Sequence, residues 1–162
     1  MAGMDMRTRR GLATLRQIHG RAGIEVLDTL ARTAPELSRF VIAFAFGDIY
    51  ARPQLSLRDR QLATVASVAT LGHALPQLKS HINGALNLGI TKTEIIELLM
   101  QMAVYAGFPA AINAIGVAAD VFAERHAAKE PKRAARSPQQ TTGRRRPRAQ
   151  KHSALRGRGK SP

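Results

Sequence analysis

His81 is the side chain best placed for acid–base chemistry in this sequence of 162 residues. Leu78, Ile82 and Ala85 recur at the spacing of one helical face and predict the buried centre of an amphipathic helix. At about 100° per residue, His81 lies beside that centre, and Gln77 precedes it by four residues on the same flank. A histidine at such an edge is partly desolvated yet can reach a cleft, which suits general acid–base catalysis near neutral pH. The alternative, a structural histidine bonded to a backbone carbonyl, is the commoner case.

Asp48 and Arg52 form a second set, because side chains four residues apart meet on one helical face. The planar guanidinium of Arg52 can hold a substrate carboxylate, with Asp48 orienting it, and Arg60 can support the same anion site. The alternatives are a structural ion pair between Asp48 and Arg52 at a helix end, and a solvated Arg60. These residues therefore predict an anion site whose role stays open.

The composition excludes several classes of protein. The sequence contains no cysteine, so disulfide frameworks, thiolate metal sites, Fe–S clusters and cysteine nucleophiles are impossible. There is no HExxH, Gly-rich phosphate loop or GxSxG motif, and the histidine spacing predicts no metal site. Tryptophan is absent and aromatic residues make up 4%, which argues against a base-stacking surface. No apolar run approaches the roughly 18 residues of a membrane span, and residues 1–20 lack the core of a secretory signal, so we expect a cytoplasmic protein.

The elements that must position these side chains are helices, since no segment shows a convincing strand pattern. Pro35 suits a first helical turn, Gly89 suits a helix end, and Thr91 with Glu94 has the form of a capping box. Six helices are expected, at about residues 7–19, 35–52, 58–72, 76–88, from 92 to a break at 105–109, and 110–127. The sequence therefore predicts an all-α fold, a compact bundle of about six helices.

The helix expected at 35–52 carries an apolar stripe of Leu37, Phe40, Val41 and Phe44. Small residues are common in the last four helices, and the third and sixth are mostly apolar, which implies more buried surface than a single chain needs. Exposed apolar patches favour self-association, so we expect a homo-oligomer.

Most of the net charge of +14 lies outside the segment expected to fold, which carries +3 in residues 1–20. Residues 128–162 hold twelve basic residues and one acidic residue, whereas residues 21–127 are neutral. Because residues 128–162 contain a single large apolar residue, we expect a helical domain at 1–127 followed by a disordered basic tail. That tail is predicted either to contact polyanions through their phosphates or to be a solvated extension without such a role.

Four segments occur in a recognisable order, FGDIYARP at 46–53, LRDRQL at 57–62, LKSHI at 78–82 and YAGFPAA at 105–111. With them the sequence resembles the carboxymuconolactone decarboxylase family, within the all-α alkylhydroperoxidase D-like superfamily, over about residues 30–125. The peroxidase branch of that superfamily uses a Cys-x-x-Cys pair, which would fall at Ala74 and Gln77, and a proton-relaying glutamate, which would fall near Gln61. Thiol-based peroxide reduction through that motif is therefore excluded.

The resemblance implies a carboxy-lyase without a cofactor, which converts 4-carboxymuconolactone to the 3-oxoadipate enol-lactone in the protocatechuate branch of aromatic catabolism. It assigns Arg52 to a carboxylate of this small anionic lactone and His81 to proton donation or oxyanion support. Gln77, where the decarboxylase often has Glu, is predicted to hydrogen-bond the lactone, and Tyr105 is a further candidate. It also implies a trimer or hexamer.

Two alternatives to that activity stay open. One is a family member that acts on another lactone or on a β-keto acid. The other is a non-enzymatic oligomer that presents its basic tails to nucleic acid.

Overall fold

A computed structural model describes residues 4–129 of the chain, so most of the predicted basic tail lies outside the described residues. The described elements are all helices, and their bounds are α1 (Met6–Thr33), α2 (Pro35–Phe40), the π-helix η1 (Val41–Tyr50), α3 (Leu57–Leu71), α4 (Leu75–Asn87), α5 (Lys92–Ala106) and α6 (Phe108–Lys129). The all-α prediction is confirmed. None of these helices combines the length and the apolarity that crossing a membrane requires.

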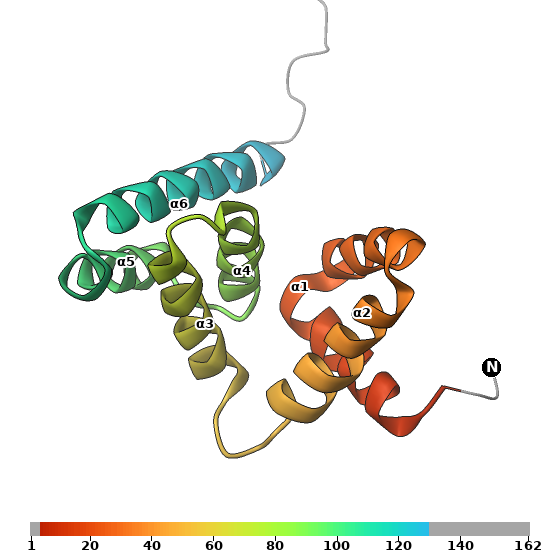
Figure 1. The fold of residues 1–162 in the computed structure, drawn as a ribbon. Helices are drawn as coiled ribbons and strands as arrows, with labels where there is room; N and C mark the ends of the chain where they lie inside the picture. The colour runs from red at the N-terminus through yellow and green to blue at the C-terminus, as the bar shows by residue number, and fades with distance from the viewer. Residues whose placement is uncertain (1–3, 130–162) are drawn as a thin grey trace, which may run out of the picture. The chain divides into compact units, whose positions relative to one another are not determined.

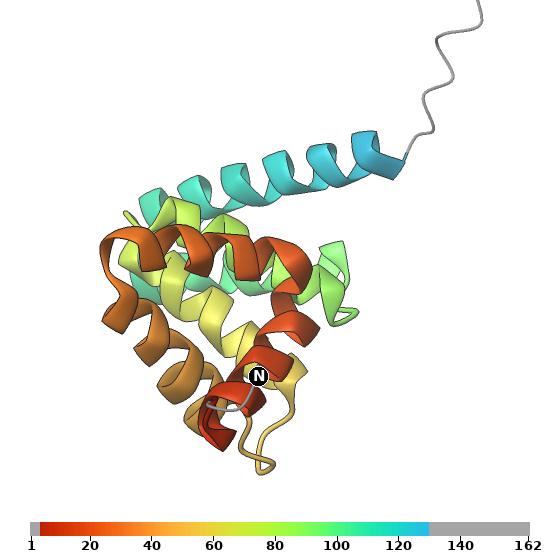
Figure 2. The same ribbon diagram turned by 90° about the vertical axis from the view of Figure 1, so that its right-hand side faces the viewer.

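Helix α1 is twice as long as predicted, because the chain bends and then continues as a helix. It begins at Asp5, whose side chain accepts a hydrogen bond from the Thr8 amide. The bend is at Gly20, where φ is 61° and ψ is −147°, a conformation that glycine adopts at little cost. The expected helix at 7–19 is therefore only the first half of α1, and Figure 2 shows the two halves meeting at this bend.

The segment after α2 differs from the prediction because it is a π-helix, with hydrogen bonds from i to i+5. The wider turn changes which side chains face inward, and Ala43, Phe46 and Gly47 are buried. Most of the expected apolar stripe faces solvent in a single chain, and the exposed fractions are 51% at Leu37, 54% at Phe40 and 56% at Phe44. Leu37 and Phe40 belong to α2, whereas Phe44 belongs to the π-helix, which does not follow the period of 3.6 residues on which the stripe is predicted.

Glycine allows α1 to cross η1 closely. A Cβ atom on Gly47 would lie 2.5 Å from the carbonyl oxygen of Arg7, and one on Gly11 would overlap the carbonyl oxygen of Ile42. Interiors are close-packed, so an added methyl group at such a crossing must displace backbone. The two glycines therefore set the distance between the two helices.

Helices α3 to α6 share one hydrophobic core, and α1 with η1 contributes to another. The first core is made by buried residues of all four helices, among them Val65, Ala69, Leu78, Ile82, Ile95, Leu99, Ala118 and Val121. The second core is centred on Leu15, Ile18, Leu27 and Phe46. Figure 1 shows α3, α4, α5 and α6 gathered together, with α1 beside α4 and α2 beside α1.

The predicted helix ends in this part of the chain are confirmed. Thr91 accepts a hydrogen bond from the Glu94 amide, and the Glu94 side chain accepts one from the Thr91 amide, which is a complete capping box. Gly89 has a φ of 80°, as a glycine after a helix end often does. These local signals place α4 and α5, and with them His81.

Candidate active site

A cleft of about 330 Å³ lies where α1, η1 and α4 meet. Its walls are mostly apolar side chains, and its polar side chains come from α1 and α4. The lining includes Leu15, His19, Leu27, Phe46, Gln77 and His81. A mostly apolar concave site with a few converging polar groups is the usual form of a small-molecule site. Of the predicted site residues, the cleft brings together His81 and Gln77.

His81 is neutral at physiological pH in this environment. Burial lowers the pKa of its imidazole to about 4, and the neighbouring His19 contributes in the same direction. Both effects disfavour the charged ring, the first by desolvation and the second by repulsion between like charges. A neutral imidazole can donate a hydrogen bond from one nitrogen and accept one at the other.

Gln61 on α3 is the direct partner of His81 and was not predicted as such. Its Nε2 atom lies 3.0 Å from Nδ1 of His81 and 2.7 Å from the His81 carbonyl oxygen. Gln61 has no exposed surface, and it shares the inward row of α3 with Val65 and Ala69 at four-residue spacing. A polar residue on such an apolar row is the signal that would have singled it out.

His19 is the second histidine of the cleft, and its sequence context predicts no role for it. Its ring lies edge to face with His81, with centroids 5.1 Å apart, and with Phe46, with centroids 5.8 Å apart. Burial lowers the pKa of His19, and a hydrogen bond with the backbone of Ser80 partly opposes this. His19 comes just before the bend at Gly20, so only the path of α1 in three dimensions shows that it meets α4.

The expected pairing of Asp48 with Arg52 is not the one formed. Asp48 accepts hydrogen bonds from Arg7, whose Nε lies 2.9 Å away, and from Arg10 at 3.1 Å. The pKa of Asp48 is lowered, first by the hydrogen bond from Arg7 and then by the charges of both arginines. The reason is the close crossing of α1 and η1 at Gly47, which brings the first turns of α1 to this carboxylate.

The other predicted site residues lie outside the cleft within one chain. Arg52 is exposed and lines a separate hollow with Thr14 and Tyr50. Arg60 donates a hydrogen bond to the carbonyl oxygen of Arg52 at 3.2 Å. Tyr105 is 75% exposed on α5.

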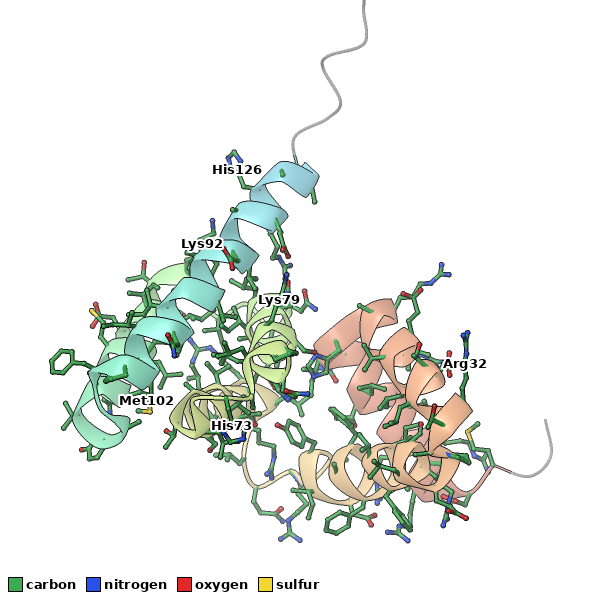
Figure 3. The ribbon with its side chains drawn as sticks, turned by 45° about the horizontal axis from the view of Figure 1, so that its top comes forward. Arg32, His73, Lys79, Lys92, Met102 and His126 are labelled. Carbon is green, nitrogen blue, oxygen red and sulfur yellow. The ribbon has the colours of Figure 1, made fainter. Side chains whose placement is uncertain are left out.

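The remaining described histidines also lie outside the cleft. Figure 3 labels His73 at the turn between α3 and α4 and His126 near the end of α6. Within residues 4–129, no group of three or more His, Asp or Glu side chains lies together in a way that could hold a metal ion.

The described residues thus form an all-α fold with a neutral histidine in a mostly apolar cleft. The model of the carboxymuconolactone decarboxylase family matches residues 35–120, and the chain belongs to this family.

Two curated relatives support this assignment. The chain is 31% identical over 119 residues to the 4-carboxymuconolactone decarboxylase of Acinetobacter baylyi, a match that covers 73% of this chain and 88% of that protein. It is 33% identical over 98 residues to the nitrosuccinic acid decarboxylase of Metarhizium robertsii, which covers 57% of this chain and 67% of that protein. Both relatives are named as decarboxylases, so a decarboxylase-type lyase is the activity that the family relationship supports.

Proposed function

We propose that this protein decarboxylates a small carboxylated lactone, 4-carboxymuconolactone, in aromatic-compound catabolism and without a cofactor. The observation that carries the proposal is the neutral His81 in a mostly apolar cleft, where Gln61 forms a hydrogen bond with its Nδ1 atom. The relative from Acinetobacter baylyi supports the choice of substrate.

The reaction makes limited demands on a protein. The bond between the ring carbon and the carboxylate breaks, CO2 leaves, and the electron pair delocalises through the ring alkene to the lactone carbonyl oxygen. One proton then adds to the ring carbon next to the lactone carbonyl, and the ring alkene now includes the carbon that lost CO2. The protein must therefore bind the carboxylates, stabilise the oxyanion and allow a proton to return.

His81 suits the stabilisation of this oxyanion. With a pKa of about 4 it carries no charge at neutral pH, so it is a hydrogen-bond donor rather than a ready source of protons. Preorganised donors aimed at developing negative charge are commonly the largest contribution to catalysis. Of the two roles that the family resemblance implies for His81, we therefore propose oxyanion support. Gln77, on the same helix and the same cleft, is the proposed hydrogen-bond donor to the lactone.

The apolar walls of the cleft favour the loss of CO2. A carboxylate that leaves water for contact with side chains such as Leu15, Leu27 and Phe46 loses solvation. Its charge spreads over a larger system as the bond breaks, so the transition state loses less solvation than the ground state. This difference lowers the barrier.

The substrate carboxylates need a cation, and the residues that line the cleft within one chain include no Arg or Lys. Arg52 is exposed, and the described residues contain no ion pair that engages it. We propose that a second copy of the chain, in the expected homo-oligomer, brings its Arg52 to the cleft. The exposed apolar side chains Leu37, Phe40 and Phe44 near the same segment supply a reason for the copies to associate.

Turnover of purified 4-carboxymuconolactone tests the function, with CO2 release and loss of the lactone as readouts. We expect His81→Ala and Arg52→Ala each to lower kcat/KM by more than about tenfold, equivalent to about 1.4 kcal/mol. His73→Ala, which changes a histidine outside the cleft, is the matched control and should keep its activity. Losses below tenfold for both site variants would contradict the assigned roles. No turnover by the wild type would contradict the substrate.

Decarboxylation of a different small carboxylic acid is the second candidate function. The relative from Metarhizium robertsii is named for nitrosuccinic acid, which is not a lactone. A panel that includes carboxylated lactones, β-keto acids and nitrosuccinic acid separates these possibilities, because the substrate with the highest kcat/KM identifies the class.

A further inference from the structure

We propose that Gln61 is a positioning residue that fixes the proton of His81 on Nε2, so that the imidazole presents an N–H group to the cleft. The inference rests on the proposed function for its catalytic consequence. The position of the proton itself is a property of the folded protein, so it can be measured without any substrate.

The two contacts of Gln61 determine the orientation of its amide. The atom that lies 2.7 Å from the His81 carbonyl oxygen must be a donor, because a carbonyl oxygen only accepts. That atom is therefore the NH2 group of Gln61. A flipped amide would place two oxygen atoms against each other at hydrogen-bond distance, which is unfavourable.

The orientation of the amide in turn determines the tautomer of His81. The same NH2 group lies 3.0 Å from Nδ1 of His81, and an NH2 group has two protons, one for each acceptor. Nδ1 must therefore accept and carry no proton. In a neutral imidazole the proton then resides on Nε2, the nitrogen that remains for a ligand in the cleft.

The burial of Gln61 supports a role beyond packing. The side chain has no exposed surface, and its Oε1 atom is a buried acceptor without a hydrogen-bond partner. A buried unpaired acceptor is destabilising, and an apolar side chain of the same size would avoid that cost. The amide thus leaves one polar atom unpaired in the interior, while its NH2 group is fully used by His81.

The surroundings leave room for this amide and little else. Gly84, on α4 one turn after His81, has no side chain there, and a Cβ atom on it would lie 3.0 Å from Nε2 of Gln61 and 3.1 Å from Cε1 of His19. His19 is the other titratable ring in contact with His81, and it also resists a positive charge. The groups of α1 and α3 that contact His81, the ring of His19 and the amide of Gln61, are therefore neutral.

The tautomer can be read directly by nitrogen NMR of histidine-labelled protein, since a protonated and an unprotonated ring nitrogen give well separated signals. The His81 signals are assigned by their loss in His81→Gln. In the wild type at neutral pH we expect an unprotonated Nδ1 and a protonated Nε2. A wild-type His81 with its proton on Nδ1, or with both nitrogens protonated, would overturn the proposal.

Two substitutions of Gln61 separate donation from packing. Gln61→Met has a similar length and no donor, so the Nε2–H tautomer loses its preference. In Gln61→Glu, measured at pH 8, the ionised side chain can only accept and draws a proton onto Nδ1. Gln101→Met and Gln101→Glu, at an exposed position of α5, are the matched controls and should leave the His81 signals unchanged.

Kinetics with the proposed substrate complete the test. We expect Gln61→Glu at pH 8, which moves the proton to Nδ1, to lower kcat by about tenfold or more with a smaller change in KM, because the lost donor acts mainly in the transition state. Gln61→Met should lower kcat by a smaller factor, because part of its rings keep the proton on Nε2. Circular dichroism and the unfolding midpoint check that the variant folds.

The outcomes keep the two proposals apart. If the wild type does not turn over the lactone but shows the Nε2–H tautomer, the substrate is wrong and the role of Gln61 in setting the tautomer stands. If folded Gln61→Met keeps both the tautomer and the wild-type kcat, Gln61 is structural and the inference is wrong, whatever the substrate.

Discussion

The imidazole rings of His19 and His81 meet edge to face in the cleft, with centroids 5.1 Å apart and ring planes at 71°. One ring comes from α1 and the other from α4, so the contact joins the two hydrophobic cores of the described domain. Burial disfavours a positive charge on either ring, and a charge on one ring would repel a charge on the other. The pair is therefore neutral at physiological pH, and protonation of either ring at lower pH destabilises the folded protein.

Acid should destabilise the protein through His81. The pKa of His81 is about 4 in the folded protein and about 6.5 in the unfolded chain, so the unfolded chain binds the proton first as pH falls. The stabilisation is complete above about pH 6.5 and is lost progressively toward pH 4, by up to about 3 kcal/mol in the free energy of unfolding. Urea titrations from pH 7 to pH 4 measure this loss.

His81→Gln should flatten that dependence, because the variant has no proton to take up at this position. His73→Gln is the control and should retain the wild-type slope. A slope in His81→Gln as steep as that of the wild type would show that other groups cause the acid sensitivity.

Removal of His19 should raise the pKa of His81. His19→Leu keeps the cleft apolar and removes the ring whose charge opposes protonation of His81. Because burial is the larger cause, the pKa should rise only part of the way to its ordinary value. An NMR titration of the assigned His81 signals measures the change, and a lower pKa in the variant would contradict the repulsion between the two rings.

Mixed oligomers should recover activity if two copies of the chain build one site. His81→Ala and Arg52→Ala alone are each expected to lose more than about tenfold in kcat/KM. Random mixing would give about one quarter of the sites an intact residue of each kind, so coexpressed variants should regain up to about that share of the wild-type rate. Two His81→Ala preparations with different affinity tags are the control. No recovery in a confirmed mixed oligomer would contradict a site that takes His81 from one copy and Arg52 from another.

The close crossing of α1 and η1 should not tolerate a methyl group. In Gly47→Ala the new Cβ atom meets the carbonyl oxygen of Arg7 at 2.5 Å, so backbone must shift. We expect a loss of about 1–3 kcal/mol in the free energy of unfolding, the usual cost of overpacking. Gly116→Ala in α6, where a Cβ atom meets nothing within 4 Å, should instead be stabilising by about 0.5–1 kcal/mol. Urea denaturation of both variants measures the difference.

Deletion of residues 128–162 should leave turnover intact and abolish salt-sensitive binding to polyanions. The proposed site draws on residues of the helical domain, whereas a net charge of +11 lies in the deleted segment. Binding to a DNA duplex of mixed sequence at two salt concentrations, together with the decarboxylase assay, measures both effects. Lost turnover with intact binding would reverse this division of roles.

The sequence by itself determined the helical class, the helix ends at Gly89 and Thr91, and the placing of His81 and Gln77 on one flank of α4. These features depend on residues within a few positions of one another, where backbone preferences and hydrogen bonds act directly. The family relationship could be predicted in the same way, because it depends on short segments in a fixed order.

Only the tertiary structure decided which side chains meet across helices. It joined Asp48 to Arg7 and Arg10 instead of Arg52, because α1 crosses η1 where glycines let the two backbones approach. It also brought His19 and Gln61 to His81, although α1, α3 and α4 lie apart along the chain. Such contacts depend on the bend of α1, the width of the π-helix and the packing of two cores, and the periodicity of a single helix contains none of this information.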